Sequence, residues 1–228
     1  MMDFQAGEII PISKPYTWTS FQIVSKVRYH LSRKYGIKRF KVGHAGTLDP
    51  LATGVLLLCT GKATKRIEEL QSHTKEYVAE ITLGATTPSF DMEHPVDATY
   101  PYEHITKEMV EDVLQQFTGD IEQRPPLFSA CKVEGKRAYD LARKGSDMQL
   151  EPKKIRIDSI ELLEYDLPRI KIRVTCGKGT YIRSLARDIG QALQSGGYLS
   201  DLIRTRIGEY KLEDCITPDA FQEWLENQ

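Results

Sequence analysis

The stretch GHAGTLDPLATGVL, residues 43–56, combines a constrained loop with the start of a buried strand. Glycine, proline and small residues are dense in it, so its backbone is able to follow a tight path that bulkier residues would forbid. The apolar run VLLLC, residues 55–59, overlaps its end and predicts a fully buried strand. A rigid strand next to a constrained loop can hold a reactive side chain in a fixed position.

Two ionisable side chains, His44 and Asp49, lie in this loop. The chemistry of a carboxylate suits Asp49 to act as a nucleophile, a general base or a metal ligand. An aspartate before a proline is also ordinary turn chemistry, in which the carboxylate only bonds to the local backbone. The residues of the loop leave both interpretations open.

The composition excludes several classes of protein. A chain of 228 residues is able to form one large domain or two small ones, and its 40% hydrophobic and 28% charged residues are typical of a globular protein. Its apolar runs are far too short to cross a bilayer, and the N-terminal residues lack the features of a signal peptide. Four scattered cysteines without a CxxC pair argue against a zinc site and favour a reducing, cytoplasmic setting.

Charge is distributed in blocks although the whole chain carries a net charge of −1. Residues 1–75 carry a net charge of +7, and residues 124–211 also carry +7. Residues 76–123 carry −10, and residues 212–228 carry −5. Two basic blocks separated by an acidic one are typical of a protein with a single face for an anionic ligand, although charge blocks also simply solvate helices.

Periodicity and breakers predict the main elements around the loop. Thr19 or Ser20 caps a helix, and the sequence predicts a strand over residues 75–84 with Tyr77 on its apolar face. Two further strands are expected within residues 153–176, followed by a turn and a helix that Thr180 caps. The buried face of the first helix is predicted to consist of Phe21, Ile23, Val24, Val27 and Leu31.

Four segments of the sequence are longer than generic motifs and more unusual in composition. They are GHAGTLDPLATGVLLLCTGKATK (43–65), TKEYVAEI (74–81), the Gln-x-Pro-Pro-x-x-Ser-Ala-x-Lys core from Gln123 to Lys132, and KGTYIR (178–183). Together they resemble the signature of the TruB family, the tRNA pseudouridine-55 synthases. The resemblance spans most of residues 9–211.

The resemblance implies roles for particular residues. Asp49 matches the catalytic aspartate of the family, Tyr77 the tyrosine that stacks on the target base, and Arg183 the arginine that pairs with the aspartate. Such a guanidinium favours the ionised carboxylate and orients it. Asp91 falls near another family aspartate and receives no role. The residues implied to bind substrate are His44, Lys14, Tyr181, Leu202 and Lys132, although a lysine beside a turn proline, as Lys14 is, is ordinarily solvated.

The family also implies an α/β (α+β) architecture, the pseudouridine synthase fold, with a large mixed and mainly antiparallel sheet flanked by helices. Residues 1–211 are expected to form the catalytic domain, with an insert at about 124–152 that closes on the RNA. Residues 212–228 are expected to form a short acidic helix. They are too few for the RNA-binding PUA domain that many relatives carry.

The implied activity is isomerisation of uridine 55 in the tRNA T-loop after base flipping, without a metal or an organic cofactor. The expected partner is the T-arm of tRNA, and the expected state is a cytoplasmic monomer without membrane contact. Two alternatives remain open: a non-catalytic chaperone that binds and refolds tRNA, and a synthase that acts on another RNA. Composition and spacing alone indicate only a cytosolic α/β protein compatible with nucleic acid.

Overall fold

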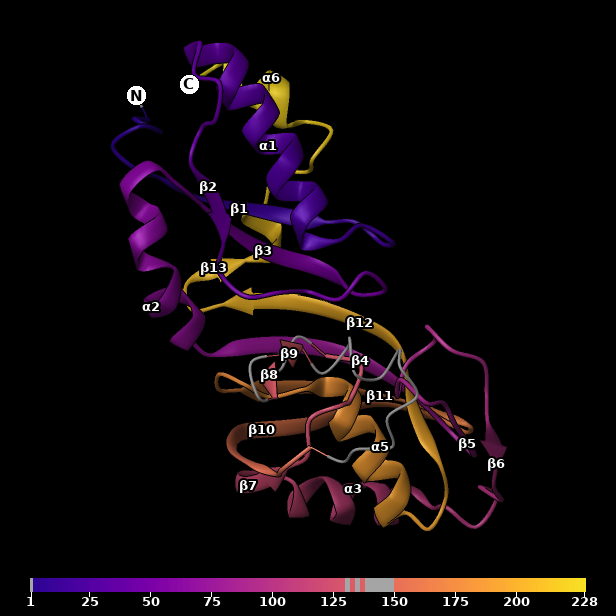
Figure 1. The fold of residues 1–228 in the computed structure, drawn as a ribbon. Helices are drawn as coiled ribbons and strands as arrows, with labels where there is room; N and C mark the ends of the chain where they lie inside the picture. The colour runs from indigo at the N-terminus through magenta and orange to yellow at the C-terminus, as the bar shows by residue number, and fades with distance from the viewer. Residues whose placement is uncertain (1, 130–131, 134–135, 138–149) are drawn as a thin grey trace. The chain divides into compact units, whose positions relative to one another are not determined.

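The computed structural model describes residues 2–129, 132–133, 136–137 and 150–228. It contains a nine-stranded, mixed and mostly antiparallel sheet, and the described residues form five α-helices (Figure 1). The strand order is β1-β3-β12-β4-β11-β10-β7, with β2 paired to β3 and β13 paired to β12. This confirms the expected architecture. The chain divides into two compact units, Met1–Tyr77 with Leu202–Gln228, and Val78–Asp201.

The first unit is built around the strand predicted from the VLLLC run, β3 (Thr53–Thr60). Two antiparallel neighbours pair with it, β1 (Ile9–Lys14) and β2 (Val42–His44). Strand β12 (Gly197–Ile207) pairs with β3 in parallel, through Ile203 to Thr53 and Arg204 to Gly54. The remaining elements of this unit are β13 (Tyr210–Lys211), α1 (Ser20–Tyr35), α2 (Ile67–Ser72), α6 (Phe221–Glu226) and two short 3-10 helices (Gly61–Arg66 and Leu212–Asp214).

Helix α1 begins where its sequence predicts, after Thr19. Thr19 and Gln22 form a reciprocal capping box, and Gly36 ends the helix in the left-handed region with φ 65°. The predicted position of Phe21 is wrong, because its side chain is 66% exposed. The buried stripe starts one residue earlier, at Ser20, and Phe21 falls outside it. Figure 1 shows α6 beside α1, and its Phe221 and Leu225 join the same core cluster.

The second unit contains an antiparallel hairpin, β10 (Lys153–Asp166) and β11 (Arg169–Cys176), with β7 (Gly119–Gln123) paired to β10. Strand β4 (Lys75–Leu83), which like β12 contributes to both units, shows the predicted alternation of buried and half-buried residues. Helix α3 (Lys107–Gln116) packs against β10 and α5 (Ile182–Ala192). The described residues of this unit also form two small ribbons: β5 (Ala85–Thr86) with β6 (Ala98–Thr99), and β8 (Lys132–Val133) with β9 (Lys136–Arg137).

The start of α5 differs from the sequence-based expectation. Its N-cap is Tyr181 rather than Thr180, and the side chain of Tyr181 makes no capping hydrogen bond to the helix. The hydroxyl of Thr180 instead donates to the carbonyl oxygen of Gly177, at 3.2 Å. Among the described residues, no helix is both long enough and apolar enough to cross a membrane.

Candidate active site

Asp49 lies half-buried in the loop between β2 and β3, and hydrogen bonds within the first unit hold that loop. The amide of Ala52 donates to the carbonyl oxygen of Asp49, at 3.0 Å. The buried hydroxyl of Ser20 donates to the carbonyl oxygen of Leu48 at 3.1 Å and accepts from the amide of Leu48 at 3.0 Å. The backbone on both sides of Asp49 is therefore fixed, which limits the directions its carboxylate can take.

Arg204 on β12 connects the two ends of this loop. Its guanidinium, only 2% exposed, donates to the carbonyl oxygens of Val55 at 2.7 Å, Thr47 at 3.3 Å and Gly46 at 3.3 Å. The strands approach so closely that a Cβ on Gly54 would lie 2.2 Å from the carbonyl oxygen of Arg204. Sequence reasoning assigned no role to Arg204. Strand β12 also carries Ser200, Asp201, Thr205 and Arg206, so no local pattern distinguished Arg204 from its polar neighbours.

Lys14, at the end of β1, is fully buried rather than solvated. Its ammonium donates to the carbonyl oxygens of Trp18 at 2.6 Å, Pro15 at 3.0 Å and Pro50 at 3.3 Å. The pKa of Lys14 is lowered to about 8. Burial is the largest cause, the negative charge on Asp49 opposes it, and the positive charge on Arg204 adds to it. Lys14 thus fastens the residue that follows Asp49 and places a cation near its carboxylate.

This shifted pKa predicts a pH-dependent stability. The pKa of Lys14 is about 8 in the folded protein and ordinarily 10.5, so the unfolded chain binds more protons between these values and wild-type stability rises with pH there. The unfolding free energy of the wild type minus that of Lys14→Met should therefore increase by about 1–3 kcal/mol as the pH rises across this window. Urea titrations at several pH values measure it, with exposed Lys62→Met as the matched control. A difference that stays constant or shrinks contradicts the shift.

Three other predicted residues also belong to the first unit. His44, on β2, is half-buried, and its Nδ1 is buried with no hydrogen-bond partner within the described parts of the chain. Burial lowers the pKa of His44, a hydrogen bond with the backbone of Gly46 opposes this shift, and the charge on Arg204 adds to it, so the net effect favours the neutral imidazole. Tyr77 on β4 and Leu202 on β12 are 8% and 7% exposed.

Arg183, in the first turn of α5, is buried in the second unit with Asp91. Its guanidinium donates to the carbonyl oxygens of Ser89 at 3.2 Å and Phe128 at 3.0 Å, and its Nε lies 3.7 Å from Oδ2 of Asp91. The other oxygen of Asp91 accepts from the Ser89 hydroxyl at 2.6 Å and from the amide of Glu93 at 2.9 Å. Asp91, which the sequence left without a role, therefore forms a buried ion pair with a predicted catalytic residue.

Gln123 is a third residue, after Arg204 and Asp91, to which the sequence assigned no role. Its side chain accepts from the amide of Tyr181 at 2.8 Å and donates to the carbonyl oxygen of Tyr181 at 3.1 Å. This two-point contact holds the N-terminus of α5, from which Arg183 projects. The backbone of Lys132 lies in β8, whereas its side chain and most of the expected insert at 124–152 lie outside the described residues.

Comparison with protein families matches the chain in two adjacent parts. Residues 32–182 match the model described as "TruB family pseudouridylate synthase (N terminal domain)". Residues 183–228 match "tRNA pseudouridylate synthase B C-terminal domain". The chain belongs to the TruB family. It is therefore a pseudouridine synthase, an isomerase, as the sequence resemblance predicted.

Curated relatives support the same assignment over the full length of the chain. The "tRNA pseudouridine synthase B" of Phocaeicola vulgatus is 66% identical over 227 residues, covering 100% of this chain and 97% of the relative. The protein of the same name from Flavobacterium johnsoniae is 49% identical, covering 98% of each chain.

Solved structures show the fold of this TruB-family chain within larger proteins. A chain in a crystal structure of a Cbf5-Nop10-Gar1 complex is 31% identical, with a TM-score of 0.72. A chain in an H/ACA RNP bound to a substrate RNA containing 2'-deoxyuridine is 29% identical, with a TM-score of 0.70. Both matches cover 98% of this chain but only 57% and 56% of the solved chains.

Proposed function

We propose that this TruB-family chain converts uridine 55 in the T-loop of tRNA to pseudouridine, with Asp49 as the catalytic carboxylate. The curated relatives named tRNA pseudouridine synthase B support the substrate. The observation that carries the assignment of Asp49 is its loop, whose backbone accepts hydrogen bonds from the buried side chains of Ser20, Lys14 and Arg204. So many hydrogen bonds from buried side chains to one half-buried turn are typical of a residue that must be precisely oriented.

The reaction rearranges bonds without adding or removing atoms. The glycosidic bond between C1′ and N1 breaks, the uracil rotates, and C1′ bonds to C5. C5 then loses its proton and N1 gains one, either directly or by exchange with solvent. Asp49 assists either by bonding to the sugar or base or by accepting a proton, and both routes need an ionised carboxylate in a fixed place. The cations of Lys14 and Arg204 provide a positive environment in the same unit. This chemistry uses no metal or organic cofactor.

The target base must leave its stack before it can rotate. Tyr77 supplies an aromatic face that replaces the lost stacking, and Leu202 supplies an apolar surface beneath the base. Neutral His44 contacts the RNA as a hydrogen-bonding group rather than as a cation. Arg183 pairs with Asp49 in this proposal, and Asp91 and Gln123 position Arg183 through α5.

The T-arm is the proposed partner, bound through the two basic blocks of the chain. Lys132 and Tyr181 contact its backbone, and the insert at 124–152 closes on it. Residues 1–211 act as the catalytic domain and residues 212–228 as a short acidic terminal segment. The enzyme works as a monomer in the cytoplasm.

A direct assay on RNA tests this function. The purified chain, incubated with an unmodified tRNA transcript, should form one pseudouridine, at position 55, when modified uridines are mapped by chemical sequencing. The matched transcript with cytidine at position 55 should remain unmodified. Modification of another RNA but not of tRNA would identify a synthase of different substrate. Refolding of tRNA without any pseudouridine would instead indicate the chaperone.

A further inference from the structure

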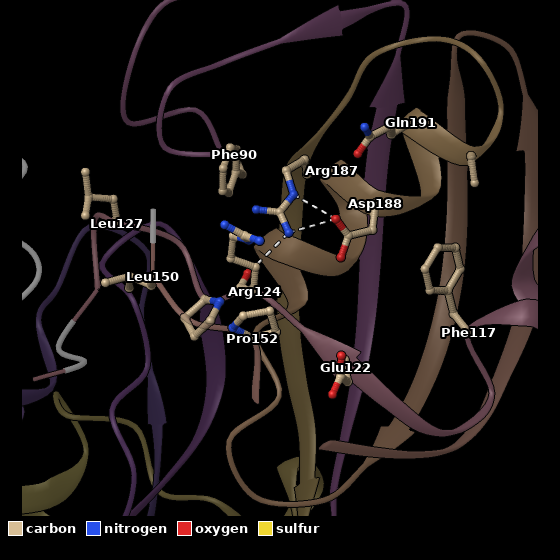
Figure 2. A pocket seen from close by; sticks show the side chains of 12 residues that line it. Phe90, Phe117, Glu122, Arg124, Leu127, Leu150, Pro152, Arg187, Asp188 and Gln191 are labelled. Carbon is tan, nitrogen blue, oxygen red and sulfur yellow. Dashed lines mark hydrogen bonds and ion pairs between the residues drawn. The ribbon is translucent and has the colours of Figure 1, made fainter. Parts of the chain in front are cut away.

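The second unit contains a pocket of about 840 Å³ that the proposed chemistry does not use (Figure 2). One wall is the face of α5 that carries Arg187, Asp188 and Gln191, one to two turns after Arg183. Figure 2 shows Arg124 and Arg187 beside Phe90 and Leu150 at one end, with Glu122 and Phe117 farther along. The volume is in the range of small-molecule sites, about 300–1,000 Å³.

Arg187 and Phe90 form an ordered cation–π stack, called the platform below, at the basic end of the pocket. The guanidinium lies 4.6 Å from the centre of the Phe90 ring. Two further contacts hold it, to Oδ1 of Asp188 at 2.7 Å and to the carbonyl oxygen of Arg124 at 3.2 Å. Its position is therefore set before any ligand arrives, so little side-chain entropy is lost on binding.

Phe90 is held in a conformation that disfavours a bulky residue. Its φ is +63°, in the left-handed region where phenylalanine is rare. Its amide donates to the carbonyl oxygen of Thr87 at 3.2 Å, and its own carbonyl oxygen accepts from the amide of Leu199 at 2.9 Å. Strain of this kind persists where the surrounding structure over-determines it, and it is frequent at ligand sites. An aromatic ring is thus kept at a position that would suit glycine or asparagine.

A residue that lines the pocket, Phe90, lies in the chain between two partners of Arg183. Phe90 lies between Ser89, whose carbonyl oxygen accepts from Arg183, and Asp91, whose carboxylate pairs with it. Arg187 follows Arg183 by four residues, so both side chains project from the same face of α5. Whatever occupies the pocket therefore contacts the residue between the two partners of Arg183.

We infer that this pocket binds a second, unpaired nucleotide of the RNA substrate, outside the target uridine. The inference rests on the proposed function. A base stacks on the platform of Phe90 and Arg187, since aromatic rings and guanidinium planes are the usual surfaces for unstacked bases. Arg124 adds a cation at the same end for the phosphate of that nucleotide. The carboxylate of Glu122, farther along, favours a base edge that carries N–H donors.

An abasic scan of a T-arm hairpin tests the inference. The hairpin carries pseudouridine at position 55, so that no turnover disturbs binding, and each other loop nucleotide is made abasic in turn. One position should weaken wild-type binding about ten-fold, the scale of one lost base–aromatic stack. Phe90→Asn removes the ring but tolerates the left-handed backbone. It should bind the intact hairpin about ten-fold more weakly and lose the penalty at that one position.

Two further variants keep the result interpretable. Arg187→Gln, which leaves the backbone of residues 89–91 untouched, should lose the same abasic penalty. Arg173→Gln removes an exposed charge on β11, where Arg173 pairs with Glu161 at 2.6 Å, and should keep every penalty of the wild type. Unchanged penalties in both Phe90→Asn and Arg187→Gln would overturn the pocket as a nucleotide site. Wild-type conversion of the uridine hairpin is measured in parallel, and its absence would overturn the proposed function instead.

Discussion

Asp49→Asn is expected to lower turnover of a tRNA transcript by at least about 10³-fold, within the range that catalytic acid–base groups supply. Asparagine matches the shape of aspartate and keeps its turn-forming hydrogen bonds, but it is neutral and a poor nucleophile and base. The loop should remain intact, because its contacts with Ser20, Lys14 and Arg204 involve the neighbouring backbone. Single-turnover assays measure the loss, and binding of the product hairpin should stay close to that of the wild type.

Two companion variants sharpen this result. Asp219→Asn changes a 93% exposed carboxylate in the same unit, paired with Lys26 at the surface, and should leave turnover unchanged. Asp49→Glu keeps the charge but displaces it by one methylene, so partial activity would show how strictly the carboxylate must be placed. Wild-type turnover in Asp49→Asn would remove Asp49 from the catalytic role and leave the family assignment standing.

Asp91→Asn is expected to have the second-largest effect, on both stability and turnover. The side chains of Asp91 and Arg183 are 8% and 6% exposed, and removing one partner of a buried ion pair typically costs about 3–5 kcal/mol. Asparagine retains one oxygen for the Ser89 hydroxyl and the Glu93 amide, so the turn itself should persist. The NH₂ group of the asparagine would then face the guanidinium of Arg183. Both groups are hydrogen-bond donors, so Arg183 should lose its orientation.

Urea unfolding and single-turnover kinetics together measure this effect. We expect a lower unfolding free energy and a turnover reduced at least ten-fold, with a smaller change in hairpin affinity. Asp97→Asn is the matched control, since Asp97 lies in the same segment, is exposed, and accepts a hydrogen bond from the Thr86 hydroxyl at 2.6 Å. A variant with lower stability but wild-type turnover at saturating RNA would make Asp91 structural only.

Much of the fold was predictable because its signals are local. The capping box of Thr19, the left-handed Gly36 and the alternation along β4 depend on neighbouring residues, so they are legible in the sequence. The failures were local ambiguities: Phe21 lies one helical position beyond the buried stripe, and Thr180 lies one residue before the N-cap of α5. The family and the candidate residues came from long phrases, whose letters are too specific to arise by chance.

The sequence by itself therefore determined the fold class, the family and the loop that carries Asp49. Only the tertiary structure decided that Lys14 is buried, that Arg204 ties residues about 150 positions away, and that Asp91 pairs with Arg183. These contacts join segments remote in the chain, and strand order and burial decide them rather than any local pattern. Because a charged side chain is stable inside a protein only with partners that the fold brings to it, its role is legible only once the fold is known.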